Sequence, residues 1–304
     1  MGKFWKLLKQ TFKEYNEDKV PRLAAALAYY TVFSIPPLLV IAIAIIGLFF
    51  GRSNAQDAIL KQVSTLIGAQ GADAIGTILM STDDPEGGLI ATIIGVVLLL
   101  LGASGVFGQF QDSLNTIWEV QPKPGQGIGA MIKKRFFTFS MVLGVGFLLL
   151  VSMLITTFLA SLGDIISGLL PGSPLVLLIV NFIVGFLFVT LLFALIFRYV
   201  PDAKIAWKDV WLGAAVTTLL FMIGKEVIGL YLGNSNVGST FGIFASLIVL
   251  LIWVYYSAQI MLIGAEFTHV YANMYGAKIV PENNAEIVTE EVRENEGIPH
   301  KEKK

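Results

Sequence analysis

The sequence predicts an all-α, polytopic membrane protein, and three observations carry this prediction. Of the 304 residues, 55% are hydrophobic and only 14% are charged, whereas soluble domains carry about 25% charged residues. Uncharged stretches recur along the chain, each of about the 20 residues that a helix needs to cross a bilayer. Lysine and arginine gather between alternate stretches. Apolar surface on this scale cannot all be buried in one soluble core, so lipid must cover part of it.

Six of these stretches are long enough and apolar enough to be transmembrane helices. They lie at about residues 23–50, 88–118, 136–162, 175–199, 209–232 and 240–270. Pro171, Gly172 and Pro174 delay the start of the fourth helix, because proline and glycine disfavour a helix interior. The fifth helix continues past Lys225 and Glu226. The sequence therefore predicts one six-span membrane domain over residues 23–270.

The positions of the basic residues predict the orientation. Most of the 21 lysines and arginines fall in the N-terminal tail, the loops after spans two and four, and the C-terminal tail. Arg52 and Lys61 are the basic residues of the opposite side. Basic loops stay in the cytoplasm, so both termini are predicted to be cytoplasmic. The charged residues before the first span are not typical of a cleavable signal peptide, and we expect that span to remain as an anchor.

Residues 1–22 predict a basic amphipathic helix at the membrane interface. Phe4, Leu8, Phe12 and Tyr15 recur at helical spacing, with lysines between them. Such a helix lies in the plane of the membrane with its apolar side chains in the headgroup region and its lysines against anionic lipids. We therefore expect anionic membrane lipids to be partners of this chain.

Two further segments lie outside the spans. Residues 55–80 carry apolar side chains at helical spacing and predict one or two amphipathic helices on the outer side, broken near residues 68–71. Residues 280–304 are acidic, contain two prolines and lack periodicity, so they predict a disordered cytoplasmic tail.

The composition disfavours several function classes. The chain has no cysteine, which excludes disulfides, thiolate nucleophiles and cysteine-based metal sites. It has two histidines and no His-Glu-x-x-His motif, and we expect neither a metal nor a cofactor. The net charge of −1 gives no general attraction to nucleic acid. We therefore expect a protein that is not an enzyme and does not bind nucleic acid.

The fifth span contains two charged residues, Lys225 and Glu226. A charge at membrane depth is unfavourable by a few kcal/mol, so such residues usually face a partner or a wet cavity and mark a transport pathway. Neighbouring residues point about 100° apart on a helix, so we expect them to pair poorly with each other. Asn181 in the fourth span lies at similar depth and is a candidate neighbour. The simpler alternative is that Lys225 extends along its stem to the interface.

The first span has an interruption and a polar half. Pro36 and Pro37 remove backbone donors, so we expect the helix to kink or open there and to line a cavity. Tyr29, Tyr30 and Ser34 precede the prolines and are candidates for the same pathway. The alternatives are a packing kink and hydroxyl groups that bond to nearby carbonyls or helices.

A second polar set falls near the cytoplasmic ends of the spans. Its members are Arg22, Asp112, Asn115, Glu119, Arg198 and Glu266. Asp112, Asn115 and Glu119 follow helical spacing and are predicted to share one face. The set predicts either an inner gate or interfacial ion pairs that fix helix ends, which contribute little individually.

Several segments resemble the YihY/BrkB family of bacterial inner-membrane proteins. They are RLAAALAYYTVFSIPPLL (22–39), DSLNTIWEV (112–120), FRYVPDAKIAWKD (197–209), LFMIGKEVIGLYL (220–232) and LIWVYYSAQIMLIGAEF (251–267). The resemblance covers about residues 10–275 and implies a six-span domain in the bacterial inner membrane. The positions that match the family pattern are Arg22, Tyr29, Tyr30, Pro36, Pro37, Asn115, Trp118, Lys225, Gly264 and Glu266. The acidic tail is not part of this pattern and is expected to be dispensable.

Family members have been described as virulence factors, as ribonuclease BN and as transporters of lipids or small solutes. With the intramembrane charges, the resemblance favours a transporter or flippase-like protein for a lipid or another amphiphilic or small solute. A non-transporting scaffold in envelope assembly is the alternative, and small-residue helix faces would allow a homo-oligomer. Ribonuclease activity is disfavoured because the chain lacks clustered metal-binding carboxylates and paired histidines.

Overall fold

The structure is a computed structural model that describes residues 2–82, 105–123, 173–234, 245–289 and 292. Its long helices are α1 (Gly2–Glu17), α2 (Val20–Phe50), α3 (Arg52–Thr82), α6 (Ser173–Tyr199), α7 (Trp207–Asn234) and α9 (Ala245–Tyr275). A further helix covers residues 105–117. The strands are β1 (Val120–Pro122), β2 (Ala203–Lys204), β3 (Val280–Pro281) and β4 (Ala285–Ile287).

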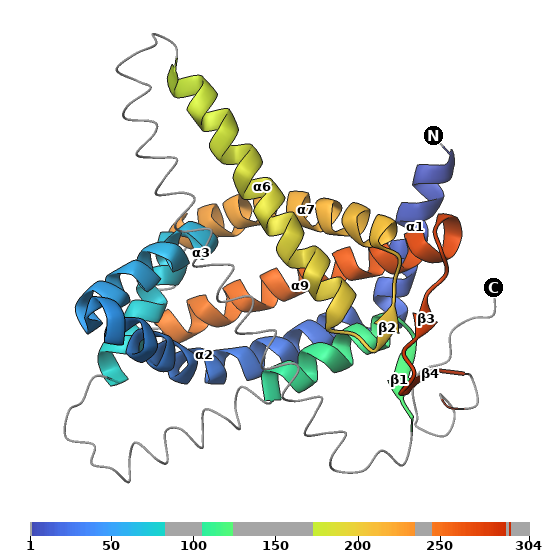
Figure 1. Ribbon diagram of the computed structural model, residues 1–304, viewed down its shortest axis with the longest axis horizontal. Helices are drawn as coiled ribbons and strands as arrows, with labels where there is room; N and C mark the ends of the chain where they lie inside the picture. The colour runs from blue at the N-terminus through green and yellow to red at the C-terminus, as the bar shows by residue number, and fades with distance from the viewer. Residues whose placement is uncertain (1, 83–104, 124–172, 235–244, 290–291, 293–304) are drawn as a thin grey trace.

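Helix α9 is the centre of the arrangement. It runs between α2 and α7 and also packs against α1 and α3, while α6 packs on α7 (Figure 1). The four short strands and α1 gather at one end of the bundle, and α3 lies at the opposite end (Figure 1). Helices α2, α7 and α9 thus run from the strand end of the bundle to α3.

Three helices of the described chain are long and apolar enough to cross a membrane. Their apolar stretches are Phe182–Tyr199 in α6, Trp207–Leu232 in α7 and Leu247–Tyr275 in α9. They coincide with the fourth, fifth and sixth predicted spans, and α2 is one continuous helix where the first was predicted. Residues 136–162 and the first part of 88–118 lie outside the described residues. The presence of six spans and the orientation of the chain in the membrane therefore remain predictions.

The predicted opening of the first span and the predicted break in the segment after it are wrong. Helix α2 continues through Pro36 and Pro37 without opening, because its residues on both sides of the prolines, Val32 and Ile43, are packed in one apolar cluster. Helix α3 continues through residues 68–71, where a break was predicted. Its apolar residues Ile59, Val63 and Ile75 pack in the same cluster, and packing of this kind outweighs the weak helix propensity of glycine.

The chain reverses between α2 and α3 at a single glycine. Gly51 has a φ of 82°, in the region that residues with a side chain rarely adopt, and its N–H donates to the carbonyl of Gly47 at 2.9 Å. A Cβ on Gly47 would lie 3.2 Å from the Cα of Arg52. The two glycines therefore allow α3 to fold back against α2.

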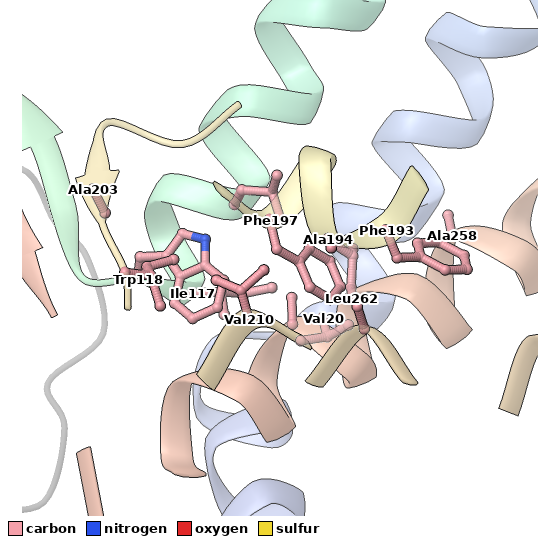
Figure 2. Packing of buried hydrophobic residues seen from close by; sticks show 14 of the residues in the cluster. Val20, Ile117, Trp118, Phe193, Ala194, Phe197, Ala203, Val210, Ala258 and Leu262 are labelled. Atoms are coloured by element: carbon pink, nitrogen blue, oxygen red, sulfur yellow. The ribbon is translucent and has the colours of Figure 1, made fainter. Parts of the chain in front are cut away.

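The main apolar core lies near the strand end of the bundle. Figure 2 shows Val20 of α2, Ile117 and Trp118, Phe193 and Phe197 of α6, Val210 of α7 and Leu262 of α9 packed together. The rings of Trp118 and Phe197 meet edge to face with centroids 6.3 Å apart. Because five separate segments contribute to it, this core fixes their ends relative to one another.

Helices α7 and α9 interlock through a reciprocal pair of glycines and threonines. A Cβ on Gly213 of α7 would lie 1.7 Å from Oγ1 of Thr268, and a Cβ on Gly264 of α9 would lie 2.0 Å from Oγ1 of Thr217. Each threonine hydroxyl donates to the carbonyl of the glycine one turn earlier on its own helix, at 2.7 Å. The hydroxyls are satisfied inside the interface, and the glycines let the backbones approach closely.

The N-terminal helix predicted at the interface is present as α1, and one of its faces docks on the bundle. Leu7 is buried against Phe267 and Val270 of α9. Phe4 and Phe12, which belong to the predicted apolar stripe, are 63% and 62% exposed. The stripe therefore lies beside the docked face and leaves Phe4 and Phe12 uncovered, while Tyr15 is partly buried against the main core.

The prediction of a disordered tail from residue 280 is wrong for its first part. Strand β3 pairs antiparallel with β2, and β4 pairs antiparallel with β1. Backbone pairing, rather than an apolar period, orders this segment, so a search for periodicity did not detect it. The rest of the predicted tail, apart from residues 288–289 and 292, lies outside the described residues.

Candidate functional site

Asp202 is the centre of a buried hydrogen-bond network at the strand end of the bundle. It lies in the loop between α6 and α7 and is 4% exposed. Gln111 Nε2 donates to Asp202 Oδ1 at 3.1 Å, and Asn115 Nδ2 donates to Oδ2 at 2.8 Å. The backbone N–H of Asp202 donates in turn to Asn115 Oδ1 at 2.8 Å. Gln111 and Asn115 lie one turn apart on helix 105–117, so one face of this helix binds the loop between α6 and α7.

Residues 276–288, which we call the C-terminal strap, complete this network. The N–H of Glu282 donates to the carbonyl of Asp202 at 2.9 Å. Close by, Asp209 in the first turn of α7 accepts from the N–H of Ala277 at 3.0 Å. The helix dipole stabilises a carboxylate in the first turn of a helix. The N–H of Ala277 in the strap stabilises the Asp209 carboxylate further. The loop is thus held by helix 105–117 on one side and by the strap on the other.

Arg198 stabilises the turn after α6. Its guanidinium donates to the carbonyl of Ile205 and lies over the Trp207 ring, 5.9 Å from the ring centroid. Both contacts join the last turn of α6 to the start of α7. This favours the alternative in which Arg198 fixes a helix end over the one in which it belongs to a gate.

The predicted shared face of Asp112, Asn115 and Glu119 is wrong. Asn115 is buried, Asp112 is exposed, and helix 105–117 ends before Glu119. Glu119 has a φ of 53°, so the chain leaves the helix there, and its carbonyl accepts from the N–H of Val288 at 2.9 Å. Arg22, the first cation of the predicted set, is exposed. Of these four residues, Asn115 is the one that joins the buried network.

Glu266 and His269 stand one turn apart on α9 and are buried beside the main core. Glu266 is fully buried, and the His269 ring meets Trp118 edge to face at 5.9 Å. Burial of an ionisable carboxylate in apolar surroundings is unfavourable unless polar groups compensate it. Glu266 thus belongs to the protein interior at this end of the bundle.

Glu226 lies on the exposed side of α7, and Lys225 is half-buried between that side and the face that packs on α9. Gly224 faces α9, since a Cβ there would lie 2.2 Å from Ile260. Lys225 Nζ lies 3.7 Å from Glu226 Oε1, and the two side chains are 33% and 75% exposed. This separation is longer than a hydrogen bond, so the contact between these neighbours is a weak one, as the sequence predicted.

The polar half of α2 divides between the surface and the interior. Tyr29 and Tyr30 are exposed and meet edge to face at 5.7 Å, while Ser34 is buried. Thr31 Oγ1 donates to the carbonyl of Leu27 at 2.7 Å, as the alternative of back-bonding hydroxyls predicts. Tyr30 also covers Gly105, where a Cβ would lie 2.9 Å from its Cδ1. Tyr30 therefore packs α2 against helix 105–117.

A polar contact joins α1 to α9. Tyr15 Oη donates to Gln259 Oε1 at 2.6 Å. Burial, together with the nearby Tyr255, raises the pKa of Tyr15 above its usual value of 10.0. A raised pKa keeps the phenol protonated at physiological pH, so it remains a donor to Gln259.

The side chains of Asn181, Pro36 and Pro37 lie outside the described part of the structure, so their place in a pathway stays a prediction. Sequence reasoning missed Gln111, Asp202 and Asp209. A Pro-Asp pair in a short loop between two spans was the available signal for Asp202. Among the described residues, no group of three or more His, Cys, Asp or Glu side chains converges on a common point.

Comparison with known proteins places these features in a family. UPF0761 membrane proteins from Albidiferax ferrireducens and Pseudomonas aeruginosa are both 29% identical, over 86% and 82% of this chain. One from Methylibium petroleiphilum is 28% identical over 91%. The matches cover 61%, 58% and 64% of these relatives, so the chain spans about three fifths of their length. No solved structure matches the chain.

The family model described as virulence factor BrkB matches residues 11–288. The match includes the C-terminal strap, so the expectation that the pattern ends near residue 275 is wrong for residues 276–288. The matched region contains the three membrane-length helices, the Asp202 network and the Lys225–Glu226 pair. The chain belongs to the virulence factor BrkB family of membrane proteins.

Proposed function

We propose that this chain is a membrane transporter of the flippase kind, which moves a lipid or another amphiphilic or small solute across the bacterial inner membrane. The Lys225–Glu226 pair carries the proposal. It lies within Trp207–Leu232, a stretch of α7 apolar enough to cross a membrane. Charges at such a position are unfavourable by a few kcal/mol and usually have a functional reason.

The surroundings of the pair suit an amphiphile. Ile223, Val227 and Leu230 of α7 are exposed around Lys225 and Glu226. The ammonium group of Lys225 would bind an anionic headgroup, and the apolar side chains would contact the hydrocarbon part. Because Lys225 and Glu226 offset each other's charge, the site is less unfavourable when it is empty. An anionic headgroup would compete with Glu226 for the lysine.

Replacing Lys225 with alanine is expected to abolish specific binding of an anionic amphiphile. The test is mass spectrometry of the molecules that co-purify with the protein in nanodiscs. We expect the wild type to retain one anionic amphiphile above the bulk lipid composition and the variant to lose it. Lys208→Ala is the matched control, since Lys208 is an exposed lysine near the start of the same helix.

Bulk lipid alone in the wild type and in both variants would contradict the lipid-handling proposal. Retention of the same amphiphile by Lys225→Ala would contradict the assignment of the site to Lys225. Flux through reconstituted vesicles provides a second readout, and flux that is unchanged by Lys225→Ala would exclude this lysine from the pathway.

A scaffold is the second candidate, and Gly229 favours it. A Cβ on Gly229 would meet nothing within 4 Å, and the adjacent Leu230 and Tyr231 are exposed. Open small-residue faces allow helices of different chains to approach closely. A scaffold predicts that Gly229→Ile disrupts a homo-oligomer or complex more than Lys225→Ala does, and cross-linking in native membranes would measure it. If the chain is a transporter, Lys225→Ala should reduce flux more than Gly229→Ile does.

We propose that the strand end of the bundle faces the cytoplasm and that α1 lies on anionic lipid there. Lys3, Lys6, Lys9 and Lys13 lie on the same helix as the exposed aromatic side chains of Phe4 and Phe12. The chain has no native cysteine, so Phe12→Cys provides a unique thiol for an environment-sensitive fluorophore. We expect a blue-shifted emission in nanodiscs that contain anionic lipid, and a smaller shift at Lys6→Cys, an exposed position about 120° around the helix from Phe12. Equal shifts at both positions would contradict an inserted apolar stripe.

A further inference from the structure

The C-terminal strap crosses the end of the bundle and is paired to two loops. Beyond the two strand pairings, the N–H of Lys123 donates to the carbonyl of Asn284 at 3.0 Å, and Lys123 Nζ donates to the carbonyl of Asn283 at 3.0 Å. Gln121 Nε2 donates to Glu286 Oε1 at 3.0 Å. The strap therefore joins the segment after helix 105–117 to the segment after α6.

The strap has few apolar anchors. Its strands are two and three residues long. Ala285 is buried, Ile279 packs at the edge of the main core, and most other residues from 276 to 288 are exposed. Segments with short ladders and little buried apolar area open locally at a much smaller free energy than the whole fold. The strap can therefore detach while the helices remain folded.

Detachment has a specific consequence at Asp202. Its carbonyl is bound by the strap, while its carboxylate and its N–H are bound by Gln111 and Asn115. Loss of the strap removes one of the two sides that hold the loop between α6 and α7. It also uncovers the edges of β1 and β2. Helix 105–117 and the α6–α7 loop would then be joined by the Asp202 side-chain bonds and by the packing of Ile117 and Trp118 with Ile205 in the main core.

We propose that residues 276–288 are a latch, whose release lets the end of helix 105–117 separate from the loop between α6 and α7 and gives solvent access to the core at that end. The latch is a property of this end of the bundle and does not depend on the transport of any solute. It assigns to the segment after the last long helix a role in controlling access, where the sequence predicted a dispensable tail.

The absence of native cysteine permits a direct test with a single reporter thiol. Ile117 is fully buried in the main core at the latched end, and Leu250 is fully buried in the cluster near α3. Each is changed to cysteine in the full chain, alone or with Ala285→Arg, which forces a charge into the buried anchor of β4. The rate of maleimide labelling is then measured in nanodiscs.

We expect Ala285→Arg to speed labelling at Ile117→Cys by about tenfold or more, as a local opening that becomes more populated would do. Labelling at Leu250→Cys should stay unchanged, which shows that the fold as a whole is intact. Equally faster labelling at both cysteines would mean that the whole protein unfolds. Unchanged labelling at Ile117→Cys would mean that detachment of the strap does not expose the core. Either result would overturn the proposal.

A reversible lock gives an independent test that needs no destabilising change. Gln121 and Glu286 are direct partners in the β1–β4 pairing, and antiparallel partners stand at a separation that a disulfide spans. In Gln121→Cys/Glu286→Cys, we expect oxidation to slow amide hydrogen exchange at residues 114–120 by about tenfold relative to the reduced form. Identical exchange in the two forms would show that the strap does not control opening there.

Discussion

Replacing Gly213 with valine is expected to lower the stability of the folded protein by about 3 kcal/mol or more, the upper range for overpacking. The new Cβ would fall 1.7 Å from Oγ1 and 2.6 Å from Cβ of Thr268. A β-branched threonine that bonds to its own helix cannot rotate away without losing that bond. Helices α7 and α9 must then move apart along their whole interface. Intrinsic tryptophan fluorescence during heating in detergent should show a fall of roughly 5–10 °C in Tm.

The same helix provides the control for this prediction. Gly229→Val adds the same side chain to α7 at a position with no atom within 4 Å, and it should leave the Tm nearly unchanged. Gly264→Val should resemble Gly213→Val, because its Cβ would meet Thr217 in the mirrored contact. If Gly229→Val and Gly213→Val lower the Tm equally, the loss of stability comes from placing valine in helix α7. It would then not come from the contact between Gly213 and Thr268.

Replacing Asp202 with alanine is expected to give the second large effect, a loss of about 3 kcal/mol or more. The change leaves the buried side chains of Gln111 and Asn115 without their acceptors, and each unsatisfied buried group contributes about 1–3 kcal/mol. Asp202→Asn should be milder, because the amide retains one acceptor oxygen for the two donors. Chemical denaturation in mild detergent, or the fraction of monodisperse protein after heating, would measure the series.

Asp73→Ala is the matched control, since Asp73 is an exposed aspartate on α3. Surface changes of this kind usually stay within about 0.5 kcal/mol. An Asp202→Ala protein as stable as the Asp73→Ala protein would contradict the assignment of the network as a stabilising junction. The double variant Asn115→Ala/Asp202→Ala should be less destabilised than the sum of the single changes, because the two residues share their bonds.

The regular helices could be predicted from the sequence because their signal is local. Apolar stretches and helical spacing gave α6, α7 and α9, and the stripe of Ile59 and Val63 gave the buried face of α3. The predicted opening of α2 and the predicted break of α3 were wrong for a tertiary reason. Proline in α2 and glycine in α3 weaken a helix locally, yet both helices pack against neighbours on each side of the weak point, and only the fold shows this packing.

The polar network could be predicted only in part. Asn115 was found through its helical spacing with Asp112 and Glu119, whereas its partner Asp202 lies 87 residues away in a loop where carboxylates are common. The strap is paired with a segment 165 residues earlier, through backbone groups that every sequence has. Lys225 and Glu226 were found because a charge within an apolar span needs no partner to be noticed.

The order in which the chain is synthesised gives the strap a further consequence. A ribosome adds about 5–20 residues per second, and 165 residues separate Gln121 from its partner Glu286. The newly made chain therefore waits on the order of 10–30 s between the appearance of β1 and that of the strand that pairs with it. During this interval the helices can insert while one end of the bundle is still unsealed. Changes in the strap should then reduce the yield of newly made protein more strongly than they reduce the lifetime of protein that has already matured.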